Sequence, residues 1–154
     1  MSVLRLSHIG LCVSELERSV SFYRDALEFQ ELSALDVSGA DADTLLELEG
    51  VKLRAVYLER DGTRIELLQF DAPGCTGGPG PAPVNRLGLT HLSLRVDDLD
   101  ATVLAVERSG GRCLAATRIE NPRFQTRAVF VVDPDGLRIE LLQTPGDPSA
   151  LPAA

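Results

Sequence analysis

The sequence is poor in aromatic residues and has no long apolar run. It contains no Trp, two Tyr and five Phe among 154 residues, so it offers no evident platform for stacking nucleic-acid bases. Its longest apolar run, residues 128–132, is far shorter than the ~20 residues that a membrane-spanning helix needs. Residues 1–10 also lack an apolar stretch. We therefore expect neither a transmembrane segment nor a secretory signal.

Positive charge and cysteine are scarce as well. Fifteen Lys and Arg residues against 23 Asp and Glu residues give a net charge of −8, which disfavours nucleic acid and anionic membrane surfaces as partners. Cys12, Cys75 and Cys113 show no paired spacing. This indicates a reducing, cytoplasmic location without a disulfide framework. The expected partner is a small-molecule substrate.

The chain contains an internal duplication. The hexapeptide Arg-Ile-Glu-Leu-Leu-Gln occurs at residues 64–69 and again at residues 138–143. Two further segments match upstream of the copies, in the same order: residues 7–13 with 90–96, and residues 54–57 with 127–130. Two copies at so long a period indicate a duplicated module of about 70 residues rather than a solenoid.

Each copy has the pattern of a strand, a helix and then about three strands. In the first copy, Ser14 to Glu17 predicts a capping box for an amphipathic helix that ends near Leu27. In the second copy, Asp97 or Asp98 is expected to cap the helix that precedes Gly110. The clearest strands are expected at residues 8–13, 51–58, 63–70, 126–132 and 137–143.

The domain organisation follows from the same pattern. We predict a first module over residues 1–70 and a second over residues 89–144. Residues 71–88, half of which are Gly or Pro, are predicted to be an extended linker. Residues 145–154 are rich in Pro and poor in groups to bury, so a flexible tail is expected.

Four residues stand at equivalent places in the two copies. His8 and His91 are the only histidines, and each lies near the start of a first strand. Glu66 and Glu140 lie in the repeated hexapeptide, in otherwise mostly apolar strands, where a charge is costly unless it is paired or bound to a metal. Two imidazoles and two carboxylates suit a divalent ion such as Ni²⁺, Co²⁺, Fe²⁺, Mn²⁺ or Zn²⁺. The set predicts one metal ion with two positions left for substrate oxygens.

A purely structural role is the alternative. Each histidine could be a hydrogen-bonded strand residue. Each glutamate could form an ion pair with Arg64 or Arg138, which lie two residues away on the same strand face. The duplicated placement of all four residues favours the metal site.

The His-strand-helix opening, the Asp-Pro-Asp-Gly-x-x-Ile-Glu-Leu ending and the duplication resemble the vicinal oxygen chelate superfamily. That superfamily includes glyoxalase I, methylmalonyl-CoA epimerase, extradiol dioxygenases and bleomycin-resistance proteins. The resemblance spans about residues 4–143. It implies an α+β fold in which two tandem βαβββ modules form a curved, eight-stranded mixed sheet around a metal-binding cup. The implied metal ligands are the positions that match His8, Glu66, His91 and Glu140.

The resemblance also narrows the activity. Glyoxalase I and the epimerases have a fourth ligand at the position of Glu66, whereas dioxygenases generally do not and drug-binding resistance proteins usually lack the ligand set. We therefore predict a metal-dependent isomerase of the methylmalonyl-CoA epimerase type, with a glyoxalase I-like lyase as the alternative. An extradiol-type dioxygenase and a small-molecule-binding resistance protein are further alternatives.

The expected catalytic residues are Glu140 and Glu66, either of which could carry the substrate proton. Epimerases have a base glutamate where an alignment on Gly50 and Val51 puts Leu53. Glu47 and Glu49 could replace that base only if the local register differs.

Four arginines are candidates for binding anionic groups of the substrate. Arg54 and Arg127 occupy equivalent strand positions, and Arg118 and Arg123 flank a predicted loop. Proteins of this superfamily commonly pair, so we expect a homodimer. The sequence leaves open whether the metal cup forms within one chain or across that dimer.

Overall fold

The computed structural model describes residues 2–78 and 80–150. The chain divides into two compact units, residues 1–78 and 79–154. Residues 80–88 of the predicted linker therefore belong to the second unit, and residues 71–72 continue the last strand of the first. Part of the predicted tail, residues 151–154, lies outside the described residues.

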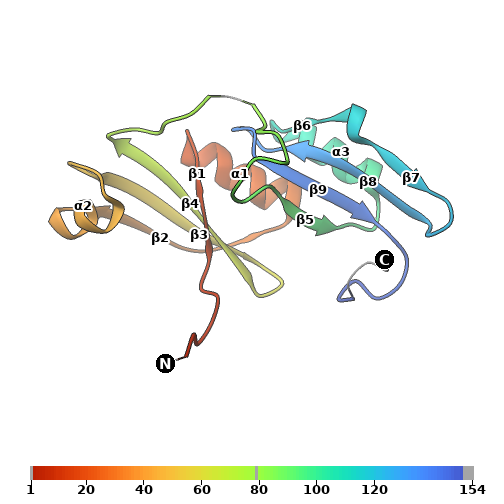
Figure 1. Cartoon of the computed structure of the whole chain (residues 1–154), viewed down its shortest axis with the longest axis horizontal. Helices are drawn as coiled ribbons and strands as arrows, with labels where there is room; N and C mark the ends of the chain where they lie inside the picture. The colour runs from red at the N-terminus through yellow and green to blue at the C-terminus, as the bar shows by residue number, and fades with distance from the viewer. Residues whose placement is uncertain (1, 79, 151–154) are drawn as a thin grey trace. The chain divides into compact units, whose positions relative to one another are not determined.

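The first module contains a four-stranded mixed sheet in the order β1-β4-β3-β2 (Figure 1). Strand β1 is parallel to β4, and the other neighbours are antiparallel. The strands are β1 (Ile9–Cys12), β2 (Gln30–Ser38), β3 (Lys52–Arg60) and β4 (Thr63–Ala72). The turn at Asp61 and Gly62, both with positive φ, joins β3 to β4 as a hairpin.

Helix α1 (Leu16–Leu27) packs against β3 and β4. Its apolar residues at helical spacing are buried as predicted. The predicted capping box is wrong, because the helix begins one residue later. Glu15 is the N-cap and accepts a hydrogen bond from the Arg18 backbone N–H at 2.9 Å, while the Ser14 hydroxyl accepts one from the Arg18 guanidinium.

Helix α2 (Ala40–Leu46), which lies between β2 and β3, was not expected from the sequence. The Asp43 carboxylate of this helix accepts hydrogen bonds from the backbone N–H groups of Gly50 (3.0 Å) and Val51 (2.8 Å). These bonds fix the loop that leads into β3.

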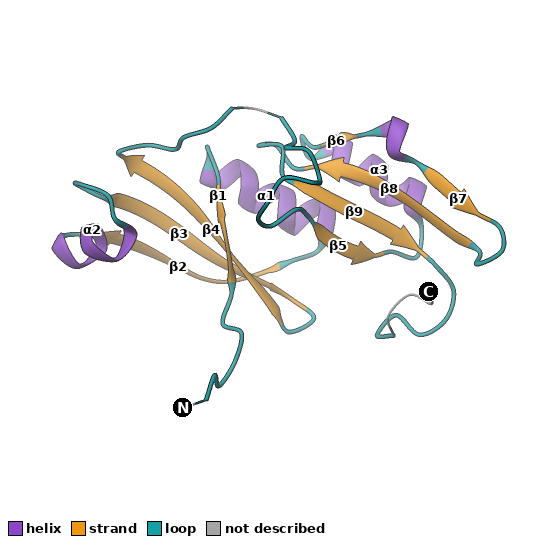
Figure 2. Ribbon diagram, in the orientation of Figure 1, coloured by secondary structure: helices purple, strands orange, loops and turns teal. Residues whose placement is uncertain are grey.

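The second module repeats the plan with a five-stranded sheet in the order β5-β9-β8-β6, with β7 also paired to β8 (Figure 2). Its strands are β5 (Leu92–Arg95), β6 (Arg112–Cys113), β7 (Ile119–Asn121), β8 (Thr126–Val132) and β9 (Arg138–Gln143). The short helix η1 (Ala115–Thr117) separates β6 from β7. Both short strands run antiparallel to β8, just as the single strand β2 does to β3.

Helix α3 (Leu99–Arg108) covers one face of this sheet and packs against β8 and β9. Asp98, one of the two predicted caps, accepts from the backbone N–H of Ala101 at 2.9 Å. The apolar residues Val129, Val131, Ile139 and Leu141 are buried. Because side chains alternate along a strand, Phe130 and Glu140 lie on the opposite face.

The predicted fold class is confirmed: the chain is α+β, with mixed sheets in two modules built on the βαβββ plan. The described residues form four and five strands instead of the eight predicted, because β6 and β7 of the second module stand where the first module has the single strand β2. In both modules the helix covers one sheet face and leaves the His–Glu residues to the other. Within residues 2–78 and 80–150, none of the helices has the length and hydropathy of a membrane-spanning segment.

Candidate metal and substrate site

The first His–Glu pair forms where β1 lies parallel to β4. His8 immediately precedes β1, and the register pairs Gly10 with Glu66. The His8 Nε2 atom lies 3.1 Å from Glu66 Oε2. The other ring nitrogen, Nδ1, lies 3.1 Å from the Ser7 hydroxyl oxygen. The glutamate side chain is only 13% exposed, so its charge faces little water.

The second pair has the same construction between β5 and β9. The register pairs Ser93 with Glu140, and His91 Nε2 lies 3.8 Å from Glu140 Oε2. The His91 Nδ1 atom lies 2.8 Å from the Thr90 hydroxyl oxygen. The Ser93 hydroxyl donates a hydrogen bond to Glu140 Oε2 at 2.7 Å. Both side chains of this pair are 32% exposed.

An aromatic ring contacts each histidine from the strand beyond the one that carries the glutamate, β3 in the first module and β8 in the second. Tyr57 contacts His8 edge-on with ring centroids 5.3 Å apart, and Phe130 contacts His91 in the same way at 5.2 Å. A hydrogen bond with the Glu66 carboxylate, together with burial and the nearby negative charge, raises the pKa of Tyr57 above its usual value. Neither ring was predicted from the sequence, although the two occupy equivalent positions of the duplicated segments 54–57 and 127–130.

The geometry of each pair fits two ligands of one metal ion. Ligand atoms bound at about 2.1 Å and at a right angle lie about 3 Å apart, which the 3.1 Å of the first pair matches. The 3.8 Å of the second pair requires a small side-chain adjustment. A hydroxyl at each Nδ1 leaves Nε2 to face the carboxylate, as in the outer shell of many metal-bound histidines.

Each pair by itself offers only two protein ligands. In the described part of the chain, no three His, Cys, Asp or Glu side chains gather into a group that could hold a metal. The structural alternative of Glu–Arg pairing is not what the side chains adopt. Arg138 Nε donates to the Ala82 carbonyl oxygen at 2.9 Å, and buried Arg64 Nε has no hydrogen-bond partner among the residues that the structure describes.

Arg54 lies on the helix-covered face of the first sheet. Its register partner is Gln69, whereas Glu66 pairs with Tyr57. The Arg54 guanidinium forms ion pairs with Glu17 of α1 (2.7 Å) and with Asp71 of β4 (3.2 Å). These contacts raise its pKa, the hydrogen bond with Glu17 being the largest cause.

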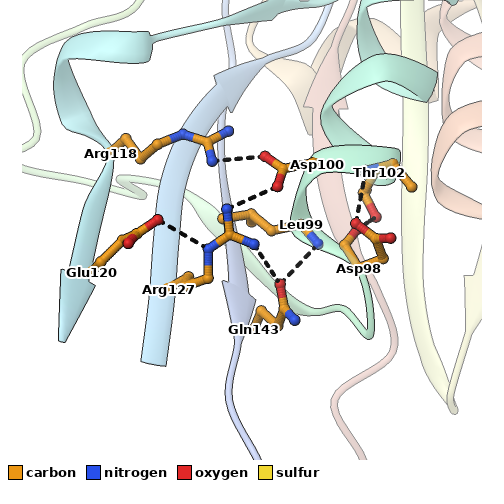
Figure 3. Close-up of polar contacts among 9 residues, drawn as sticks. Asp98, Leu99, Asp100, Thr102, Arg118, Glu120, Arg127 and Gln143 are labelled. Carbon is orange, nitrogen blue, oxygen red and sulfur yellow. Dashed lines mark hydrogen bonds and ion pairs between the residues drawn. The ribbon is translucent and has the colours of Figure 1, made fainter. Parts of the chain in front are cut away.

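Arg127 repeats this arrangement in the second module (Figure 3). It forms ion pairs with Asp100 of α3 (2.8 Å) and Glu120 of β7 (3.2 Å), and Arg118 also binds Asp100, at 2.7 Å. The hydrogen bonds from Arg127 and Arg118 lower the pKa of Asp100. In both modules, therefore, an arginine ties the first turn of the helix to the sheet.

Arg123 lies apart from this network and stacks over the Phe124 ring at 5.2 Å. An anion-binding role for the four arginines stays a prediction. The ion pairs of Arg54, Arg118 and Arg127 favour a structural role, because their guanidinium groups already have carboxylate partners.

The position aligned with the epimerase base is apolar. Leu53 is 5% exposed and packs in a cluster with Ala42 and Val51. Glu47 is the C-cap of α2, in the left-handed region with φ 53°, and Glu49 lies in the loop before Gly50. Neither glutamate takes the place of Leu53 in strand β3.

A pocket of about 380 Å³ lies beside Glu140, wholly within the second compact unit, residues 79–154. It is bounded mainly by apolar residues of β7 and β8 and by one residue of the linker. Its lining residues are Val84, Thr117, Ile119, Ala128, Val129, Phe130, Arg138 and Glu140. The pocket was not predicted from the sequence, because it depends on where residues 80–88 fold back.

Several known proteins are similar to this chain in sequence. An uncharacterised protein, YaeR of Escherichia coli, is 30% identical over 144 residues, which cover 93% of this chain and 98% of YaeR. Mouse mitochondrial methylmalonyl-CoA epimerase is 28% identical over 72% of this chain and 56% of its own length. Lactoylglutathione lyase of Haemophilus influenzae is 26% identical over 96% of this chain and 98% of the enzyme.

Solved structures share the fold. A glyoxalase family protein of Bacillus cereus is 22% identical with a TM-score of 0.82, covering 95% of this chain and 97% of its own. A mutant of the fosfomycin resistance protein FosX of Listeria monocytogenes, complexed with Mn(II), is 15% identical with a TM-score of 0.57, covering 91% and 90%. A profile of the Glyoxalase/Bleomycin resistance protein/Dioxygenase superfamily matches residues 5–141. The chain belongs to this superfamily, as its sequence motifs indicated.

Proposed function

We propose that this protein is a metal-dependent isomerase that removes an α-proton from one face of a carbonyl substrate and restores a proton on the other face of the same carbon. The observation that carries the proposal is the duplicated His–Glu pair, with a histidine Nε2 facing a glutamate Oε2 in each module. His8, Glu66, His91 and Glu140 would together hold one divalent ion, within one chain or across a homodimer. When bound, the ion would supply Lewis acidity that holds two neighbouring substrate oxygens and acidifies the adjacent C–H group.

The chain's own residues would move the proton. Glu140 is the better candidate for the base because it is more exposed than Glu66 and lines the pocket. Its carboxylate would accept the α-proton from one face of the carbon. A solvent water on the opposite face would donate the proton that inverts the configuration, and Glu140 would then return its own proton to solvent. The Ser93 hydroxyl, which donates to Glu140 Oε2, would orient the carboxylate.

Glu66 has a more fixed setting. The carboxylate is largely buried, lies against His8 and accepts a hydrogen bond from the Tyr57 hydroxyl. Such a group is suited to remain a ligand through the reaction, because moving it would break contacts that nothing else replaces.

A glyoxalase I-like lyase is the second candidate. The lactoylglutathione lyase of H. influenzae matches over almost the whole of both chains, whereas this chain spans about half of the mouse epimerase. The two reactions share the proton removal and differ in the carbon that receives the proton. Leu53 is buried and apolar, so it cannot serve as the base that epimerases have at this position. Glu140 could be the base in either reaction.

The test is solvent exchange at the α-carbon. The metal-free protein and protein reloaded with each candidate ion would be incubated in D₂O with 2-methyl-branched acyl-CoA thioesters, then with hemithioacetals, and followed by NMR. Metal-dependent deuterium uptake with inversion supports the isomerase, and conversion to a 2-hydroxy thioester supports the lyase. Metal-dependent O₂ uptake with catechols, without exchange in either class, would contradict both.

A further inference from the structure

We propose that the pocket of the second module is a subsite for a compact, uncharged apolar substituent of the substrate, and that Val84 of the linker limits its size. This inference rests on the proposed function, because Glu140 forms part of the pocket wall. It adds a substrate class: a carbonyl compound with a hydrocarbon or aryl group on the carbon next to its two reacting oxygens.

The pocket has the size and lining of a small-molecule subsite. Its volume of about 380 Å³ is at the lower end of the range typical of ligand pockets. Ala128, Phe130 and Glu140 project from the same sheet face, because Phe130 is the register partner of Glu140 and Ala128 is two residues away. Ile119 closes the side formed by β7. The candidate proton carrier and the apolar wall are therefore neighbours.

The linker is fastened to the sheet at two points that place Val84 on the wall. Arg138 Nε donates to the Ala82 carbonyl oxygen at 2.9 Å, and the Arg138 guanidinium stacks on Phe130 at 5.5 Å. Gly136, with φ 94°, approaches the backbone of Gly80 so closely that a Cβ atom there would lie 2.8 Å from it. These contacts hold residues 80–84 over the beginning of β9.

The charges around the pocket favour an uncharged occupant. Glu140 would repel an anionic substituent. Arg138, the cation among the described lining residues, already donates through Nε to Ala82 and lies against Phe130. The remaining lining, apart from the Thr117 side chain, is apolar. Burial of apolar area would therefore be the main source of affinity.

The probes are acetohydroxamic, butanohydroxamic and hexanohydroxamic acids. They are uncharged at neutral pH, present the same two neighbouring oxygens and differ only in alkyl length. The full-length protein would be titrated by calorimetry with and without Zn²⁺, and methyl resonances of Val84, Ile119 and Ala128, which line the pocket, would be followed by NMR. We expect affinity to rise with each added methylene, by up to about fourfold when the group is fully buried.

Two tryptophan variants make the test specific. Val84→Trp should fill the pocket and flatten the dependence on alkyl length to less than about twofold overall. Leu87→Trp is the matched control, because Leu87 lies on the same linker, is 98% exposed and does not line the pocket. This variant should behave as wild type.

The outcomes separate the subsite from the proposed reaction. An affinity independent of alkyl length in wild type, unchanged length dependence in Val84→Trp, or no binding of hexanohydroxamic acid at millimolar concentration would each overturn the subsite. Length dependence without any effect of Zn²⁺ would support the subsite and contradict the metal proposal. An effect of Zn²⁺ without length dependence would support the metal proposal and overturn the subsite.

Discussion

The two modules share a backbone plan, yet they hold their glutamates differently. Glu66 lies 3.1 Å from its histidine and is 13% exposed, whereas Glu140 lies 3.8 Å from its histidine and is 32% exposed. The hydroxyl that binds each carboxylate also comes from a different strand. Duplication has thus preserved the His–Glu pair while its surroundings have diverged.

The two hydroxyl groups come from different strands, although the strand register is the same in both modules. In the first module Tyr57 reaches Glu66 from β3, and Gly10 on β1 has no side chain. A Cβ at Gly10 would lie 3.3 Å from Leu68 Cδ1, so a larger residue there would require Leu68 to move. In the second module the equivalents are Phe130, which lacks a hydroxyl, and Ser93, which supplies one.

Removal of the histidines should have the largest effect. We expect His8→Ala with His91→Ala to lower metal affinity by at least about 100-fold, because even outer-shell changes at metal sites cost 10–100-fold. The fold should survive, since neither ring is among the buried core residues. Metal content after dialysis, with circular dichroism, checks this. Glu49→Gln, which changes an exposed loop carboxylate, is the control, and equal metal binding in the double variant would contradict the site.

The second largest effect should be a difference between the two glutamates in the exchange of the substrate α-proton. Glu140→Gln should reduce solvent exchange of the substrate α-proton by about 10²–10⁴-fold, the usual contribution of a general base, while much of the metal remains. Glu66→Gln should lose exchange only in proportion to metal lost. NMR in D₂O with measured metal occupancy compares the two. A larger loss in metal-loaded Glu66→Gln than in Glu140→Gln would reverse the roles of the modules.

Removal of the hydroxyl group that binds each carboxylate should have a smaller effect. Tyr57→Phe makes the first module resemble the second and should lower the free energy of unfolding by about 1 kcal/mol, the value of one hydrogen bond. Ser93→Ala should cost less because Glu140 is more exposed. Urea denaturation of the metal-free variants at pH 7 measures both. Equal losses in the two variants would argue that the carboxylates are equally well held.

The Tyr57 effect should depend on pH. The folded protein raises the pKa of Tyr57, so the stabilisation is present below the pKa of the unfolded chain, about 10, and is lost as pH rises through the folded value. Wild type should therefore lose its advantage over Tyr57→Phe as the pH is raised above about 10. A difference that stays constant up to strongly alkaline pH would contradict the Tyr57–Glu66 hydrogen bond.

Much of the fold could be predicted because the duplication and the hydrophobic periodicity can be recognised in short stretches of the sequence. The first helix ends at Leu27 as predicted, and the strand at Thr126–Val132 has the predicted bounds. The short helix at Ala40–Leu46 could not be predicted, since it depends on Asp43 binding backbone N–H groups seven and eight residues ahead. The pocket likewise depends on long-range contacts of the linker.

The candidate site was predictable in part for the same reason. The repeated positions of His and Glu identified the two pairs that the structure brings together. The repeat alone does not show on which sheet face a residue lies, and the arginines illustrate this. Arg127 and Phe130 are three residues apart in one strand, an odd separation that places them on opposite sheet faces. Alternation, applied to the sequence, would have placed Arg127 and its equivalent Arg54 on the helix-covered side.

The smallest effect should come from these arginine networks. Asp100→Asn removes the carboxylate that binds Arg118 and Arg127, but it should leave kcat/KM within about twofold, because exposed ion pairs contribute little and these lie away from Glu140. The two arginines lower the pKa of Asp100, so its stabilisation is present above the unfolded pKa of about 4 and is lost as pH falls through the folded value. Wild type and Asp100→Asn should therefore differ in melting temperature at pH 7 and converge once the pH falls below the folded pKa of Asp100. Glu17→Gln, which weakens the corresponding Arg54 pair in the first module, is the matched variant. A large loss of activity in Asp100→Asn alone would restore Arg127 and Arg118 as substrate contacts and make the second module's network functionally distinct from the first.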